Sequence, residues 1–235
     1  MEPSMIRFQN VSFAYEKDAV VLNGIDLEFQ TGLTMLLGPN GCGKSTLLKL
    51  ASGVEKPVTG QIMIDGHDHW KDEVMARKSL SYVPEQPDLT PYATIREILN
   101  LVCRLRNEPL VKGMEALAFF GLQDLASRTV RELSLGQRRR AVFAAALVGT
   151  PQHILLDEPL EGMDRQIKDE ILEWIKGHVE AGAVVVTVSH TIEPLIELTD
   201  RAVTIKEGTA FLYSKLPADP DQKLSLLDYL AKGII

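Results

Sequence analysis

The segment GPNGCGKST, residues 38–46, decides the fold of this 235-residue chain. It satisfies the pattern G-x-x-x-x-G-K-[ST], in which successive backbone N–H groups wrap phosphate oxygens at the start of a helix. The apolar run LTMLL (33–37) before it predicts a strand buried on both faces, and STLLKLASG (45–53) after it predicts a helix that ends at glycine. A strand, a glycine-rich loop and a helix are the context that a phosphate-binding loop needs.

This loop predicts a nucleotide site that uses Mg²⁺. We expect Lys44 to reach the β- and γ-phosphates and the Ser45 hydroxyl to ligate the metal. The segment HILLDEP (153–159) supplies carboxylates at the end of a buried strand, with Asp157 for the metal and Glu158 to activate the attacking water. The loop residues assigned to nucleotide binding are Gly38, Pro39, Asn40, Gly41, Cys42, Gly43, Lys44, Ser45 and Thr46.

A histidine ends a second buried strand, AVVVTVSH (183–190). This strand is expected to lie beside the HILLD strand in a parallel sheet. Because the carboxyl ends of parallel strands form the ligand crevice, we expect His190 to contact the γ-phosphate and to act with Glu158 and Lys44 in catalysis. A histidine at a strand end also has a purely structural interpretation.

The remaining patterns predict an α/β fold built as one domain over residues 1–235. The first thirty residues alternate apolar and polar, which indicates antiparallel strands. Residues 87–131 are helical by period with no strand among them, which indicates a helical subdomain. Strand and helix alternate again afterwards, and residues 211–235 form a C-terminal tail. We therefore expect a P-loop NTPase core with a mostly parallel sheet, an N-terminal antiparallel β-subdomain and a helical subdomain.

A second anion-binding turn is predicted at LSLGQRRR, residues 133–140. A serine followed by Gly-Gln and a helix places a hydroxyl and free N–H groups at a helix N-terminus, which favours negative charge. The three arginines that follow are interpreted as a solvated helix face. A protein with one nucleotide site needs only one such turn, so the second turn calls for a separate explanation.

The composition narrows the class of protein. A net charge of −7 argues against general nucleic-acid binding, which uses a concentrated basic face. The two cysteines predict no disulfide framework and favour a reducing compartment. The N-terminus has no secretory signal pattern, and no apolar stretch approaches the roughly 20 residues of a spanning helix. We therefore expect a chain that does not cross a membrane by itself.

Together these motifs resemble the nucleotide-binding subunit of an ATP-binding cassette (ABC) transporter, of the export type. The resemblance covers about Ile6 to Gly208, with the loop, helical insertion, Ser-x-Gly-Gln turn, LLDEP strand and strand-end histidine in the family's order. It implies ATP as ligand and a head-to-tail dimer, in which the turn of one unit closes over the ATP of the other. Ser134, Gly136 and Gln137 would make that contact, while Leu135 stands where the family has glycine.

The resemblance also assigns residues outside these motifs. Tyr15 matches the aromatic residue that stacks on adenine, although a packing role in the sheet is an alternative. In YVPEQP the family's metal-contacting glutamine falls on Glu85 by position, with Gln86 next. We assign the metal contact to Gln86, because a second acid near the phosphates adds repulsion. The sequence His67-Asp68-His69 is interpreted as a solvated turn rather than a metal site.

The function implied by the resemblance is ATP hydrolysis that powers transport through a separate membrane-spanning permease. That partner is expected to dock near residues 85–106, which places the chain at the cytoplasmic face of the cell membrane as a peripheral subunit. The second nucleotide-binding subunit is expected to be another copy of this chain, with a heterodimer left open. The short helical region and the lack of a large C-terminal regulatory domain favour an exporter. The alternative hypothesis is a non-transport ATPase of the family that acts on nucleic acid or ribosomes. Such relatives carry two cassettes in tandem or a long coiled-coil insertion, and this sequence shows neither.

Overall fold

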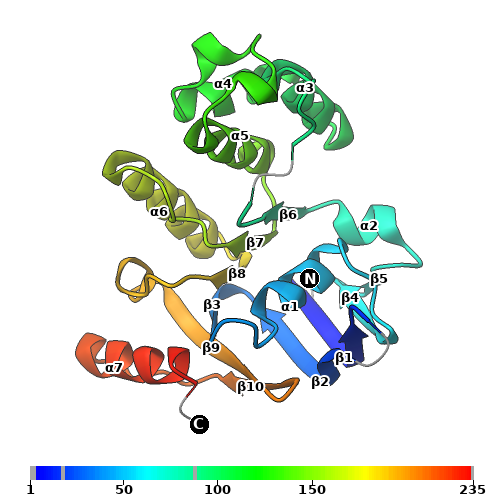
Figure 1. Ribbon diagram of the computed structural model, residues 1–235, viewed down its shortest axis with the longest axis vertical. Helices are drawn as coiled ribbons and strands as arrows, with labels where there is room; N and C mark the ends of the chain where they lie inside the picture. The colour runs from blue at the N-terminus through cyan, green and yellow to red at the C-terminus, as the bar shows by residue number, and fades with distance from the viewer. Residues whose placement is uncertain (1–3, 17–18, 87–88, 234–235) are drawn as a thin grey trace.

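The computed structural model describes residues 4–16, 19–86 and 89–233 (Figure 1). The strands are β1 (Met5–Ala14), β2 (Val20–Gln30), β3 (Gly32–Leu37), β4 (Thr59–Ile64), β5 (His67–Asp68), β6 (Leu80–Val83), β7 (His153–Asp157), β8 (Val184–Val188), β9 (Thr199–Lys206) and β10 (Thr209–Tyr213). The α-helices are α1 (Lys44–Ser52), α2 (Glu73–Arg77), α3 (Ile95–Leu105), α4 (Leu110–Phe119), α5 (Leu135–Leu147), α6 (Arg165–Glu180) and α7 (Pro220–Ala231). No helix in these ranges is long and apolar enough to cross a membrane.

Two sheets form the framework and confirm the predicted fold class. The smaller sheet has the order β2-β1-β4-β5, and the neighbouring strands in it are antiparallel. The larger has the order β10-β9-β3-β8-β7-β6, in which only the edge strand β10 is antiparallel to its neighbour. Because β10 pairs with β9, the segment that was assigned to a tail from residue 211 begins inside the sheet.

The central strands are buried on both faces, as their continuous apolar runs predict. Alternate residues of β3 pack to opposite sides: Met35 belongs to the core that includes α6 and α7, while Leu36 belongs to the core between the two sheets. That second core also holds α1, whose buried face includes Leu47 and Leu50. The phosphate-binding loop is thereby fixed between a rigid strand and a helix that is packed on two sides.

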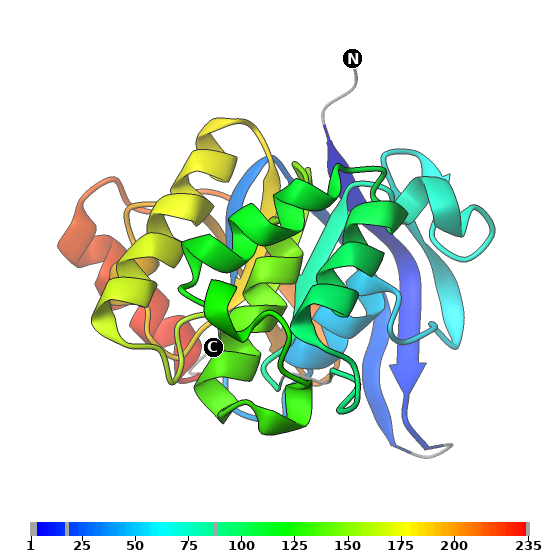
Figure 2. The same cartoon turned by 90° about the horizontal axis from the view of Figure 1, so that it is seen from above.

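Three helices form a separate lobe. Figure 1 places α3, α4 and α5 together at the end of the molecule away from β1 and β2, and Figure 2 shows the same three helices between α6 and the smaller sheet. Pro87 and Asp88, where the helical subdomain was expected to begin, lie outside the described residues. The lobe includes α5, which begins after the expected boundary at residue 131 and packs against α3 and α4.

Two predictions that a segment is exposed to solvent are wrong. His69 is fully buried rather than part of a solvated turn, because it packs under Gly53 at the end of α1. The arginines 138–140 are not a solvated helix face either. Each is half-buried and donates hydrogen bonds to backbone carbonyls of other segments, including those of Val130, Phe120 and Glu158. Guanidinium groups in these places fasten α5 to its surroundings.

Candidate active site

The phosphate-binding loop connects β3 to α1 in a conformation that requires glycine. Gly38, Gly41 and Gly43 have φ of +132°, +81° and +112°, a region that residues with a Cβ rarely adopt. Gly43 precedes the first residue of α1, so the free N–H groups of the helix start point out of the loop. The ammonium of Lys44 donates to the carbonyls of Gly38 at 2.7 Å and of Pro39 at 2.9 Å.

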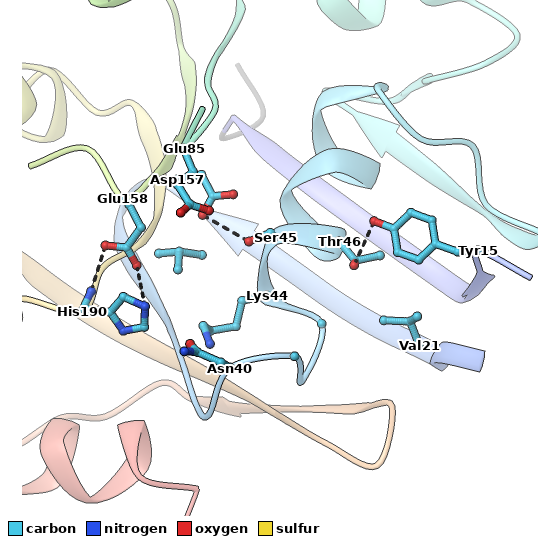
Figure 3. Close-up of a pocket in the computed structure, with 13 residues that line it drawn as sticks. Tyr15, Val21, Asn40, Lys44, Ser45, Thr46, Glu85, Asp157, Glu158 and His190 are labelled. Carbon is cyan, nitrogen blue, oxygen red and sulfur yellow. Dashed lines mark hydrogen bonds and ion pairs between the residues drawn. The ribbon is translucent and has the colours of Figure 1, made fainter. Parts of the chain in front are cut away.

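Most of the predicted site residues meet at one cavity of about 430 Å³ (Figure 3). Residues of the loop, of strand ends and of the segment just after β1 converge there although they are distant in the sequence. Its lining comprises Tyr15, Val21, Asn40, Gly41, Gly43, Lys44, Ser45, Thr46, Glu85, Asp157, Glu158, Val188 and His190. Such a concave, polar cavity at the carboxyl ends of parallel strands is a typical ligand site of an α/β protein.

Part of the loop faces the other way. Gly38, Pro39 and Cys42 line a smaller cavity of about 150 Å³ between the loop, β9 and the end of α7. Gly38, Pro39 and Cys42 do not line the larger cavity, so their contact with a nucleotide stays a prediction. A Cβ built at Gly38 would lie 3.1 Å from the Sγ atom of Cys42. Sequence spacing cannot show this, because the turn reverses the direction in which successive side chains leave the backbone.

The donor set for a divalent cation is present at one edge of the cavity. The Ser45 hydroxyl donates to Oδ1 of Asp157 at 3.3 Å, which joins the start of α1 to the end of β7. Burial raises the pKa of Asp157, and the hydrogen bond from Ser45 opposes that shift. A hydroxyl and a carboxylate are oxygen ligands of the kind that Mg²⁺ prefers. These residues therefore fit the metal.

The predicted base, Glu158, directly follows β7, is 6% exposed and is held by residues at the end of β8. Its N–H donates to the Val188 carbonyl at 2.9 Å, and its Oε2 accepts from the backbone N–H of His190 at 3.1 Å. The Nε2 of His190 lies 3.5 Å from Oε1. Burial raises the pKa of Glu158, and the hydrogen bond from His190 opposes this. The φ of Glu158 is +51°, a strained value for a glutamate that its neighbours maintain.

The loop after β6 brings Glu85 rather than Gln86 to the cavity, and the assignment of the metal contact to Gln86 stays a prediction. Glu85 lines the cavity, and its negative charge contributes to the raised pKa of Asp157, whereas Gln86 does not line the cavity. Figure 3 shows the Glu85 side chain beside Asp157, above Ser45. Consecutive side chains leave a bent backbone in different directions, so repulsion alone could not decide which residue turned inward. The structure therefore adds a third carboxylate to this edge of the cavity.

Tyr15 lies at the opposite end of the cavity from Glu158. It is 53% exposed, its ring packs edge-on against Phe13, and its hydroxyl lies 3.3 Å from Oγ1 of Thr46. An exposed ring fixed beside a phosphate-binding loop is available for stacking on a flat ligand. This placement agrees with the predicted adenine contact as well as with packing, because the ring contacts Phe13 and is still about half exposed.

The second anion-binding turn is well formed but separate. Ser134 caps α5: its Oγ accepts from the N–H of Gln137 at 3.3 Å, and Oε1 of Gln137 accepts from the N–H of Ser134 at 2.9 Å. Leu135 is 68% exposed, and a Cβ at Gly136 would meet nothing within 4 Å. Neither Ser134, Gly136 nor Gln137 lines the nucleotide cavity. Within one chain the structure therefore does not bring the two turns together.

One functional candidate was missed by the reading of the sequence. Arg139 was included in a basic run, yet its Nη2 donates to the carbonyl of Glu158 at 2.9 Å. The only signal in the sequence was a cation five residues after the serine of the turn. Nothing local indicates that this cation reaches a strand end nineteen residues later, because the contact depends on how α5 packs beside β7.

Comparisons with known proteins identify a matching family model and similar sequences. A family model described as "ABC transporter" matches residues 22–161. The chain is 34% identical to the spermidine/putrescine import ATP-binding protein PotA of Mesoplasma florum over 89% of this chain and 61% of that protein. It is 33% identical to the putative ABC transporter ATP-binding protein PH0132 of Pyrococcus horikoshii, over 87% of this chain and 81% of that one. The chain thus spans about three fifths of the PotA relative's length.

A solved structure gives the same result for the fold. The dimeric structure of MJ0796, a bacterial ABC transporter cassette, superposes with a TM-score of 0.79 at 26% identity, covering 89% of this chain and 98% of that one. A further structure of the same cassette is described as a post-hydrolysis state bound to ADP and Pi. A chain of this fold can therefore form a dimer and hold a nucleotide.

Proposed function

This chain belongs to the ABC transporter family of ATP-binding proteins, and on that premise we propose that it hydrolyses ATP to power transport through a separate membrane-spanning partner. The observation that carries the proposal is the single cavity in which Lys44, Ser45, Asp157, Glu158 and His190 converge from three elements. A phosphate cradle, a cation donor set and a buried base in one place are the parts that hydrolysis of a phosphoanhydride requires.

Each residue has a distinct part in the proposed reaction. Lys44 exchanges its two loop carbonyls for phosphate oxygens, and the loop N–H groups bind the β-phosphate. Ser45 and Asp157 hold Mg²⁺, which when bound neutralises phosphate charge. Glu158 orients the attacking water and accepts its proton, a role favoured by its raised pKa. His190 fixes that carboxylate through its backbone N–H and offers its exposed ring to the γ-phosphate.

The turn at Ser134 supports a head-to-tail dimer. It is capped, exposed and remote from the cavity of its own chain, so its helix start and open Gly136 are free to meet a phosphate that arrives from outside. In such a dimer each ATP lies between the loop of one chain and the turn of the other. We propose a homodimer, because one chain supplies both halves.

The membrane partner and direction complete the proposal. A permease would dock on the lobe near residues 85–106, which holds the chain at the cytoplasmic face of the membrane. The exposed side chains of Tyr92, Leu101 and Leu105 supply apolar surface there. We propose export on the ground of the short helical insertion formed by α3 and α4. The import function named for the PotA relative argues for the opposite direction.

The test begins with the purified chain. Release of phosphate from Mg·ATP, with formation of an ATP-dependent dimer, supports the ATPase; no turnover with or without the copurified permease would refute it. Stimulation by RNA, DNA or ribosomes instead of the permease would favour the non-transport reading. Vesicles that contain the complex in inside-out and right-side-out orientation then give the direction, since an exporter accumulates substrate only in the inside-out set.

A further inference from the structure

Arg139 joins two regions that the proposed mechanism assigns to different nucleotides. It lies in α5, one and a half turns after Ser134, the capping residue of the exposed turn. From there its guanidinium reaches the Glu158 carbonyl at 2.9 Å and lies 3.9 Å from a carboxylate oxygen of Glu161. The side chain is 11% exposed, so this contact is largely shielded from water. Shielded, charge-assisted hydrogen bonds are stronger than exposed neutral ones.

The backbone that Arg139 contacts is strained. Glu158 has φ of +51°, and only a few bonds hold it there: its N–H donates to Val188, and its carbonyl accepts from Arg139 and, at 3.3 Å, from the N–H of Glu161. A Cβ built at Gly162 would lie 3.4 Å from the Arg139 guanidinium, so the guanidinium also fills the space beneath this loop. Without it the strained residue would have no hydrogen bond from an α5 side chain among the described residues.

We propose that Arg139 is a positioning residue that holds Glu158 in place from α5. In the head-to-tail dimer, α5 begins at the turn that contacts one nucleotide, and through Arg139 it positions the base that acts on the other nucleotide. The link between two nucleotides rests on the proposed head-to-tail ATPase. The fastening itself rests only on the contacts of this chain. A displacement of α5 at Ser134 is carried along a rigid helix to the guanidinium and from there to the Glu158 carbonyl.

The neighbouring residue provides a matched control. Arg140 lies in the same helix and also donates to a backbone carbonyl, that of Phe120 at 3.3 Å, but it contacts the helical lobe rather than Glu158. Arg139→Gln and Arg140→Gln therefore remove the same charge from the same helix and break the same type of bond. Their difference isolates the contact with Glu158.

The first measurement is hydrogen–deuterium exchange of the nucleotide-free protein over residues 157–164. Arg139→Gln should raise exchange of this segment about tenfold or more, the loss expected for one hydrogen bond to a charged group. Arg140→Gln should leave it at the wild-type level. Unchanged exchange in Arg139→Gln, or an equal rise in both variants, would overturn the proposal. This measurement is independent of activity, so an inactive wild-type chain would refute the ATPase without affecting it.

The second measurement separates binding from turnover. Arg139→Gln should bind ATP within about twofold of wild type and lose about tenfold in kcat, since a misplaced base weakens the transition state rather than substrate binding. Arg139→Lys, which keeps the charge without the planar fork, should recover part of kcat. A loss that falls on ATP binding alone, or no loss of kcat, would contradict a positioning role. Should Arg139→Gln not fold, Arg139→Lys decides by the same two readouts, with a smaller loss of kcat.

Discussion

The backbone N–H of His190 donates to Oε2 of Glu158 at 3.1 Å, while its ring nitrogen lies 3.5 Å from Oε1. The two residues lie just beyond the ends of the neighbouring parallel strands β8 and β7, so the pairing of these strands brings them together. One histidine thus holds the carboxylate by its backbone and keeps its ring, which is 64% exposed, toward the cavity. The base is oriented before any ligand enters, which is the condition for efficient proton transfer.

The first prediction concerns this carboxylate. Glu158→Gln keeps the shape of the side chain but cannot accept a proton, so kcat should fall by roughly 10²–10⁴. ATP binding should persist, and the variant should accumulate as an ATP-bound dimer, visible by size-exclusion chromatography. Turnover at the wild-type rate would remove Glu158 from the role of base.

The second prediction tests which nucleotide the turn serves. Ser134→Arg fills the space at the start of α5, and Lys44→Ala removes the phosphate contact of the loop, so each homodimer should be inactive. In a head-to-tail mixed dimer one composite site inherits both lesions and the other inherits neither. ATPase activity across mixing ratios should therefore exceed that of both parents. A turn that acts within its own chain would give no gain at any ratio.

The third prediction concerns Glu85 and the metal. Among the described residues that line the cavity, Glu85, Asp157 and Glu158 supply three carboxylates and Lys44 supplies one ammonium, so ATP without Mg²⁺ is repelled. Glu85→Gln should lower the Kd for ATP in excess EDTA by about fivefold, the size expected for one partly screened charge. The Kd with Mg²⁺ should change less, because the metal already offsets that charge.

Gln86→Ala is the control for this measurement, since Gln86 does not line the cavity. It should leave the Kd for ATP unchanged in both conditions, as measured by calorimetry. A metal-dependent shift in Gln86→Ala but not in Glu85→Gln would support the assignment of the metal contact to Gln86.

The fourth prediction is a pH dependence of stability. Burial and then the charge of Arg77 lower the pKa of His69 from 6.5 to about 4. The unfolded chain therefore binds this proton first as the pH falls, so the free energy of unfolding decreases between pH 6.5 and about 4, by up to about 1.4 kcal/mol per pH unit. His69→Gln should flatten the decline measured by urea unfolding in that window.

His67→Gln serves as its control. The ring of His67 belongs to the same turn and lies 2.7 Å from Asp72, but it is partly exposed, whereas the ring of His69 is buried. This variant should keep the wild-type slope of stability against pH. Identical slopes in all three proteins would show that the His69 ring is accessible to protons in the folded state.

Much of this molecule follows from local sequence. Buried strands read as unbroken apolar runs, because parallel strands are covered on both faces. The glycines of residues 38–43 predict the loop, since only glycine adopts its positive φ angles. Asp157 and His190 were predicted to share an edge because parallel neighbours end together. In each case the physical constraint acts within a few residues or within one sheet.

Other features were decided only by packing. The sequence could not distinguish Glu85 from Gln86, because the direction of a side chain in a bent loop depends on the strand beside it. The sequence predicted that the side chains of Arg139 and His69 are exposed to solvent, since a charged or polar side chain usually is. In the structure α5 delivers Arg139 to the carbonyl of Glu158, and Gly53 at the end of α1 covers His69. The sequence by itself determined which segments form helices and strands and which functional side chains stand at their ends. Only the tertiary structure decided which distant groups meet, because those contacts depend on the relative positions of elements that no local pattern encodes.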